Sequence, residues 1–190
     1  MPVPRPISMA LASILALATA ACQTSSSRID RIYADLEHEV RAADPVALPS
    51  PDADEVHRHR ADAVREIVEE GGAADAESAF KAAVILVGTS RAADLELAES
   101  LARRSAELGE PRAMRVVAEA VDKRAMLEGK PQKYGTQYVF EWVLDSWRLH
   151  PVDVATTDAE RASMGVPTYA ELLWAEDAMN ESHGKKKRPR

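Results

Sequence analysis

From residue 92 to residue 127 the chain reads AADLELAESLARRSAELGEPRAMRVVAEAVDKRAML. Apolar residues recur every three or four positions on both sides of Gly109-Glu110-Pro111, the spacing of one face of an α-helix. Glycine commonly ends a helix, and proline suits the first turn of the next because its missing N–H has no partner there. The stretch therefore predicts an αα-hairpin of two antiparallel helices, 92–108 and 111–127.

The segments before this hairpin also have helical spacing. Residues 27–43 and 54–70 place apolar residues on one face, and Gly71-Gly72 supplies a stop for the second. Residues 76–87 are ambiguous, because 84–87 alone fits a buried strand, but the alanines before it favour a helix. No second copy of the hairpin recurs at a fixed period, which favours a compact domain over a repeat array.

The sequence changes character after Gly129, where aromatic and β-branched residues become frequent. Residues 138–142 and 147–152 lie on either side of the turn-forming pair Asp145-Ser146. Short β-prone segments around a turn signal are typical of a β-hairpin, which we expect at about 138–152.

Two capping boxes follow the predicted hairpin. Residues 157–160 and 168–171 both have threonine three positions before glutamate, so that hydroxyl and carboxylate can satisfy free helix amides reciprocally. They predict a short helix ending at Gly165 and a final helix to about Met179. The predicted fold is mainly α, a compact helical domain (28–180) of antiparallel helix hairpins with one small β-hairpin.

The first 21 residues differ in composition from the rest of the chain. Arg5 is their one charged residue, and residues 7–21 form an apolar run broken by three hydroxyl side chains. Fifteen helical residues rise about 22 Å, short of the roughly 30 Å hydrocarbon core that a transmembrane helix must cross. A positive start, a short apolar core and small residues at the end predict a signal peptide, residues 1–21.

Residues 17–22, Leu-Ala-Thr-Ala-Ala-Cys, resemble a bacterial lipobox, in which the cysteine is diacylated and becomes the new N-terminus. Thr19 departs from that pattern, which usually carries leucine at this position. Ordinary cleavage after Ala20 would instead produce a soluble periplasmic or secreted protein. Lipidation is favoured because Cys22 is the only cysteine, so it has no internal disulfide partner and stands where a lipobox needs it. The expected protein is a lipoprotein with a palmitate-type membrane anchor at Cys22, facing the periplasm or the cell exterior.

Charge narrows the choice of partners. Loss of Arg5 with the signal peptide lowers the formal net charge from −7 to −8, which argues against nucleic acid as a partner. Residues 22–27 are expected to form a flexible tether, and residues 181–190, ending in Lys-Lys-Lys-Arg-Pro-Arg, a disordered basic tail. The expected partners are the membrane, through the lipid on Cys22, and an envelope protein.

Residues 129–137 read Gly-Lys-Pro-Gln-Lys-Tyr-Gly-Thr-Gln and concentrate polar groups in one short segment. Its glycines permit positive φ or close backbone approach, and each glutamine can donate and accept hydrogen bonds. One interpretation is a loop that presents Gln132, Tyr134, Thr136 and Gln137 to a ligand. The other is a helix-to-hairpin connection whose side chains satisfy its own backbone, which composition alone favours.

This segment resembles the Gly-x-x-Gln-x-Tyr-Gly-Thr-Gln signature of an uncharacterised bacterial family of unknown function. In that family the signature follows a helix ending in an Asp-Arg step and precedes an Asp-x-x-Arg…Gly-Leu stretch. Asp122-Lys123 and the stretch from Asp158-Ala159-Glu160-Arg161 to Gly165-Val166 stand at those positions here. The family's usual Gln-His step is replaced by Gly88-Thr89-Ser90, so a histidine that did acid–base work there would be missing. The resemblance covers residues 54–175 and implies a fold and a candidate site, but no reaction.

Other chemistries find little support in the sequence. His57 and His59 would point about 200° apart on a helix and could not share a metal ion. With Cys22 committed to the N-terminus, we predict no metal site and no cofactor. No Gly-x-Ser-x-Gly elbow or P-loop spacing occurs, so no catalytic residue is assigned.

Two hypotheses follow. The first is a cell-envelope lipoprotein that serves as a non-catalytic interaction or structural module, with Trp142, Trp147 and Trp174 as contact or core residues. The alternative is a small-ligand binder or enzyme that uses the Gln132–Gln137 loop, with Asp122 and Arg161 nearby. The alternative requires these side chains to converge on an open pocket.

Overall fold

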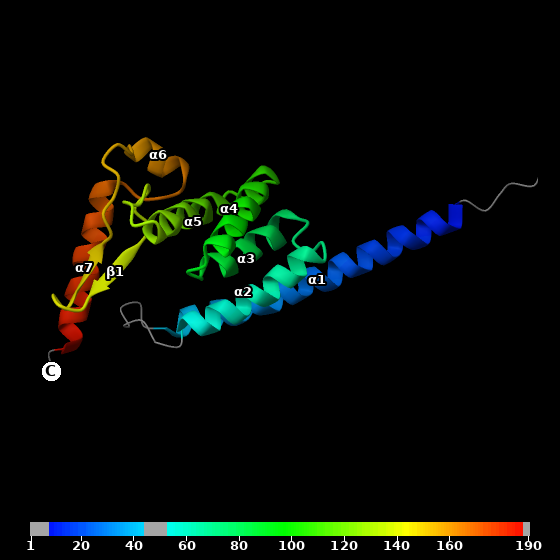
Figure 1. The fold of residues 1–190 in the computed structure, drawn as a ribbon, viewed down its shortest axis with the longest axis horizontal. Coiled ribbons are helices and arrows are strands. Elements are labelled where there is room, and N and C mark those ends of the chain that lie inside the picture. Colours follow the sequence, from blue (N-terminus) through cyan, green and yellow to red (C-terminus); the bar gives the residue numbers. More distant parts are fainter. Residues whose placement is uncertain (1–7, 44–52, 188–190) are drawn as a thin grey trace, which may run out of the picture.

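A computed structural model describes residues 8–43 and 53–187 of the chain. Within them the fold is mainly helical with one two-stranded antiparallel sheet, as the sequence predicted. The elements in chain order are α1 (Ser8–Ala42), α2 (Ala53–Glu69), α3 (Ala76–Val87), α4 (Ala92–Glu107), α5 (Ala113–Leu127), β1 (Tyr138–Glu141), β2 (Ser146–Leu149), α6 (Asp158–Ser163) and α7 (Tyr169–Lys187). In Figure 1 the helices α1 to α5 form a bundle, while the sheet, α6 and α7 gather at the far end of α5.

Helix α3 is the centre of the bundle and packs against α1, α2, α4 and α5. Its alanines Ala79, Ala82 and Ala83 are fully buried, which lets neighbouring helices approach closely. A helix that is apolar on nearly every side is stable only when it is covered all round. The ambiguous 76–87 segment is therefore a helix, and Asp75 begins it by accepting the Ser78 N–H at 2.9 Å.

The predicted αα-hairpin is confirmed as α4 and α5, which pack along each other and onto α3. Gly109 turns the chain between them with φ of +104°, a conformation that favours glycine. Ser105 Oγ also donates to the Ala76 carbonyl at 2.6 Å, which fixes α4 against the start of α3. The hairpin thereby carries the bundle to the end of α5, where the candidate site begins.

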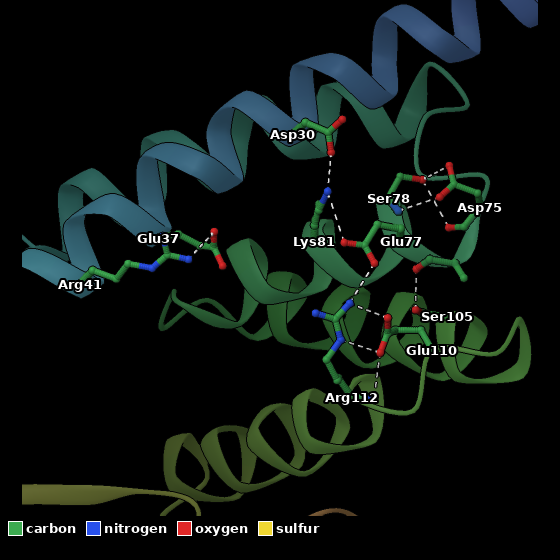
Figure 2. A network of polar contacts seen from close by, with 11 residues as sticks. Asp30, Glu37, Arg41, Asp75, Glu77, Ser78, Lys81, Ser105, Glu110 and Arg112 are labelled. Atoms are coloured by element: carbon green, nitrogen blue, oxygen red, sulfur yellow. Dashed lines mark hydrogen bonds and ion pairs between the residues drawn. The ribbon is translucent and has the colours of Figure 1, made fainter.

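A chain of charged side chains holds α1, α3 and the α4–α5 turn together (Figure 2). Lys81 Nζ lies 2.7 Å from Asp30 on α1 and 3.3 Å from Glu77 on α3. Arg112 Nη2 then lies 2.9 Å from Glu77 and 2.6 Å from Glu110 in the turn. Partly exposed ion pairs of this kind contribute little one by one, but a connected network orders the elements it joins.

The Glu110–Arg112 pair predicts a specific pH dependence. Hydrogen bonds from Arg112 hold the pKa of the Glu110 carboxyl at about 2, below the usual 4.5. A lowered carboxyl pKa contributes stability that is present above about pH 4.5 and is lost as the pH falls through about 2. We expect Glu110→Gln to lower the free energy of unfolding at pH 7 by up to about 1 kcal/mol, as for other surface ion pairs. Urea unfolding at pH 7 and pH 2 should show the difference shrinking in acid. The exposed Glu107 supplies the control for removal of a surface charge, and we expect Glu107→Gln to change the free energy of unfolding at pH 7 by no more than about 0.5 kcal/mol.

Helix α7 covers the outer edge of strand β2. Asn180 Oδ1 accepts the Trp147 N–H at 2.7 Å and its Nδ2 donates to the Trp147 carbonyl at 2.9 Å. One turn earlier, Glu176 Oε2 accepts the Leu149 N–H at 2.6 Å. Four helical residues rise about 6 Å and two strand residues about 6.6 Å, so these side chains match alternate backbone amides of the strand. The hairpin is thus attached to α7 by backbone groups that an edge strand would otherwise leave unpaired.

The structure differs from the sequence prediction at both ends. Residues 22–27, expected to be a flexible tether, continue α1, and residues 181–187 of the expected disordered tail continue α7. Neither segment contains proline, and basic residues at a helix C-terminus are stabilised by the helix dipole. Ser25 is also buried close to Gly72, and the His183 ring packs against Phe140 with centroids 5.2 Å apart. The last tail residues, 188–190, lie outside the described residues.

Export remains a prediction, because the fold of α1 does not test cleavage or lipidation at Cys22. Residues 8–21 are the start of this helix, which projects beyond the rest of the bundle in Figure 1. Among the described residues, no helix has both the length and the apolar character that crossing a membrane would need.

Candidate functional site

Asp122, on the last turns of α5, is fully buried and is enclosed by the signature loop. Its Oδ1 accepts the N–H groups of Lys133 and Tyr134 at 2.7 and 2.8 Å. Its Oδ2 accepts the N–H groups of Gly135 and Thr136 and the Thr136 hydroxyl, each at 2.9 Å. We call this arrangement the Asp122 cradle. Successive N–H groups that converge in this way form an anion-binding concavity, and here the bound anion is a carboxylate of the same chain.

Gln132 connects the cradle to the β-hairpin and is also fully buried. Its Nε2 donates to the carbonyls of Gln137 and His150 at 3.0 and 2.8 Å, and its Oε1 accepts the Gln137 N–H at 2.9 Å. The Gln132 backbone pairs with that of Pro151 and Asp153, at 2.8 Å in both hydrogen bonds. The Gln132 side-chain amide thus uses both of its N–H donors and one of its two acceptor sites inside the protein.

Gly135 sits where the loop meets α7. Its φ is +95°, and a Cβ added at this position would lie 2.4 Å from Leu172 Cδ1. Such a contact is far inside van der Waals distance, so a larger residue fits neither the backbone conformation nor the space. The glycine of the signature therefore permits both the turn around Asp122 and the close packing of α7.

Arg161, on α6, closes the cradle from the other side and is 3% exposed. Its Nε donates to the Tyr134 carbonyl at 3.1 Å. Its Nη1 donates to the Thr156 carbonyl at 2.8 Å and to Asp158 Oδ1 at 3.0 Å. The buried guanidinium thus orients α6 against the loop and has an acidic partner in Asp158.

The remaining signature residues are bonded within the loop or packed against it. Gln137 Nε2 donates to the Thr136 hydroxyl at 2.9 Å, and Tyr134 is 9% exposed with Lys133 Nζ 5.2 Å from its ring centroid. Gln137 also lines a small cavity of about 140 Å³ together with Lys123. Burial lowers the pKa of Lys123, whose Nζ donates to the Val87 carbonyl at 2.7 Å.

The six candidate ligand-binding residues are therefore close together, but they do not converge on one open pocket. Asp122, Gln132 and Thr136 direct their polar groups to the loop itself, and the Asp122 carboxylate has no acceptor site left. Arg161 lines a larger cavity, and Gln137 lines the small one on another side of the loop. This arrangement matches the interpretation of the loop as a helix-to-hairpin connection whose side chains satisfy its own backbone.

A separate surface feature surrounds Trp142, the only one of its residues that the sequence indicated as a contact candidate. Trp142, Val143 and Leu144 form the turn of the β-hairpin and are 67%, 93% and 54% exposed. We call these three residues the hairpin tip. Phe140 packs edge-on against Trp142 with centroids 5.0 Å apart and against Trp147 at 5.4 Å. The signal available in the sequence was a run of three apolar residues where turns usually carry glycine, asparagine or aspartate.

In the part of the chain that the structure describes, no cluster of three histidine, cysteine or acidic side chains is arranged to hold a metal ion. The chain matches no protein-family model, no curated protein and no solved structure. The resemblance to the uncharacterised bacterial family remains a prediction, carried by the signature residues alone.

Proposed function

We propose that this protein is a lipid-anchored module of the bacterial cell envelope that binds another envelope protein through its hairpin tip. The observation that carries the proposal is the exposure of three consecutive apolar side chains, with Val143 at 93%. An exposed run of apolar residues lowers solubility, so its presence on a surface indicates a binding role. Burying one valine or leucine side chain is worth about 1.5–3 kcal/mol, so a partner that covers the tip gains substantial free energy.

The tip is held in place before any partner arrives. The edge-on packing of Trp142 on Phe140 restricts the indole ring, and Phe140 is itself packed between Trp147 and His183. Asn180 fixes the strand below the tip to α7. Rigid aromatic groups lose little conformational entropy on binding, which is why tryptophan is common at the centres of interfaces.

The two acidic residues beside the tip favour a protein over a bilayer as the partner. Glu141 and Asp145 stand on either side of the tip; both are exposed, and Asp145 Oδ1 lies 3.3 Å from His183 Nε2 on α7. Carboxylates at that position would be repelled by anionic lipid headgroups. They suit a partner with an apolar pocket and a basic rim.

The non-catalytic part of the proposal is supported by the Asp122 cradle. The polar groups that made the Gln132–Gln137 loop a candidate for ligand chemistry make hydrogen bonds that hold α5, the hairpin and α6 together. We infer that this loop positions the hairpin, and that the anchor at Cys22 places the hairpin near envelope proteins.

Site-specific photo-crosslinking in living cells tests the interaction. A photoreactive residue at position 143 of the full-length protein should give a discrete crosslinked protein. The control is position 40 on α1, where Val40 is apolar and 64% exposed. Crosslinking to lipid alone, or equal protein crosslinking from positions 143 and 40, would contradict the proposal.

The anchor has its own test. Metabolic labelling with palmitate should mark the wild-type protein and be lost in the Cys22→Ser variant. Mass spectrometry of the mature N-terminus should find a diacylated cysteine at position 22. An unmodified N-terminus at Ala21 would show that the protein is exported without an anchor.

A further inference from the structure

A pocket of about 330 Å³ lies beside α6, between the segment that follows β2 and the start of α7. We call it the α6 pocket. Val152 and Tyr169 supply its apolar surface, with the Arg161 guanidinium 5.5 Å from the Tyr169 ring centroid, and Val154 lies at the rim and is 99% exposed. Thr156, Asp158 and Arg161 are among its polar residues. Its volume is within the range of small-molecule sites. The proposed function, which uses the hairpin tip and Cys22, does not involve this pocket.

Two nearly buried side chains that line this pocket each have one polar atom without a hydrogen-bond partner among the described residues. Arg161 is 3% exposed and Thr156 is 7% exposed. Within the described residues, Arg161 Nη2 and Thr156 Oγ1 have no hydrogen-bond partner, although the other guanidinium nitrogens of Arg161 do. Both atoms remain in contact with solvent, because neither is a buried atom without a partner. Both residues line the pocket, so it offers a cationic donor and a hydroxyl, two groups that can bind a carboxylate.

Acidic groups lie on the same pocket. Asp153 Oδ1 accepts the Ala155 N–H at 2.9 Å, and its Oδ2 has no hydrogen-bond partner in the part of the chain that the structure describes. Asp158 Oδ1 accepts the Tyr169 N–H at 2.8 Å as well as Arg161 Nη1, and within the described residues its Oδ2 is likewise unengaged. Two carboxylates near one guanidinium give the pocket a formal charge of −1, which disfavours a purely anionic ligand.

We propose that the α6 pocket binds a free apolar α-amino acid in its zwitterionic form. The carboxylate of the ligand contacts Arg161 Nη2 and Thr156 Oγ1, its ammonium group faces Asp153 and Asp158, and its side chain lies against the apolar surface. A ligand with only a carboxylate would meet two acidic groups without compensation. One with only an ammonium group would leave the Arg161 donor without an acceptor.

Calorimetric titration of the full-length protein in detergent tests the proposal with three probes. L-leucine carries both charges, N-acetyl-L-leucine lacks the ammonium group and L-leucinamide lacks the carboxylate. We expect L-leucine to bind and each analogue to bind about tenfold more weakly, because each loses charge-assisted hydrogen bonds. No heat with L-leucine at millimolar concentration, or equal binding of N-acetyl-L-leucine, would overturn the proposal.

Two variants locate the site. Thr156→Val keeps the shape of the side chain and should weaken L-leucine binding about tenfold, through loss of one hydrogen bond to a charged group. Asp153→Asn should weaken it about fivefold, while Asp177→Asn on the exposed face of α7 should leave it unchanged. If Thr156→Val also destabilises the fold and lowers the urea concentration at the midpoint of unfolding, L-leucine binding by Asp153→Asn decides the outcome. Equal effects of Asp153→Asn and Asp177→Asn would place binding elsewhere and refute the assignment. None of these results depends on the hairpin tip, so the proposed function is tested separately.

Discussion

Replacing Asp122 by alanine should lower the free energy of unfolding by about 4–6 kcal/mol, the largest effect we expect from a single substitution. The carboxylate accepts four backbone N–H groups and one hydroxyl in a fully buried position. Alanine would leave five donors without an acceptor, and each unsatisfied buried group costs roughly 1–3 kcal/mol. Urea unfolding followed by circular dichroism measures the loss.

Asp122→Asn separates the geometry of the cradle from its charge. Oδ1 serves two backbone N–H groups and Oδ2 serves two more together with the Thr136 hydroxyl, which can rotate. Either orientation of the asparagine amide therefore leaves two backbone N–H groups unpaired. We expect a loss of about 2–3 kcal/mol, near half that of the alanine variant.

The matched control is Asp177→Ala, on the exposed face of α7, which should change stability by no more than about 0.5 kcal/mol. If Asp122→Ala were as mild as this control, the carboxylate would not be the centre of the loop and the cradle would be wrong. The alternative function, with a ligand held between Asp122 and the loop, would then be open again.

Gly135→Ala should lower the free energy of unfolding by about 3 kcal/mol, because it combines two penalties. The residue has φ of +95°, and the new Cβ would lie 2.4 Å from Leu172 Cδ1. Non-glycine residues in the left-handed region cost about 1–2 kcal/mol, and the collision adds a further cost because α7 must shift.

Gly109→Ala is the matched control for the backbone penalty. Gly109 has a similar φ of +104°, but nothing lies within 4 Å of the position its Cβ would take. We expect it to cost only about 1–2 kcal/mol. In a Leu172→Ala background, Gly135→Ala should cost the same as Gly109→Ala, since the collision is gone. Equal costs for Gly135→Ala in both backgrounds would show that α7 does not pack on the loop as described.

Both predictions concern one physical arrangement. The loop has the backbone geometry of an anion site, and the anion is supplied by α5 of the same chain. A buried carboxylate bonded in this way fixes the loop against α5, and the hydrogen bonds of Gln132 and Arg161 extend that constraint to the hairpin and to α6. The candidate site of the sequence is thus best understood as the joint that orients the hairpin tip and the α6 pocket.

Local sequence patterns were sufficient for most of the secondary structure. Helix α4 and helix α5 follow from apolar spacing around Gly109, and both capping boxes form as expected, with Thr157 and Glu160 bonded reciprocally in α6. These features depend on residues within one or two turns of one another. The tether prediction for 22–27 was wrong because serine-rich composition does not interrupt a helix that has a neighbour to pack against.

The sequence by itself determined the helices, the hairpin and the identity of the residues in the signature loop, because each depends on periodicity or on contacts between near neighbours. Only the tertiary structure decided what those residues do. Asp122 meets its donors 11 to 14 positions further along the chain, and Asn180 meets Trp147 from 33 positions away. The exposure of Val143, and the Arg161 nitrogen that has no partner among the described residues, likewise depend on what the rest of the chain leaves uncovered, and no local pattern contains that information.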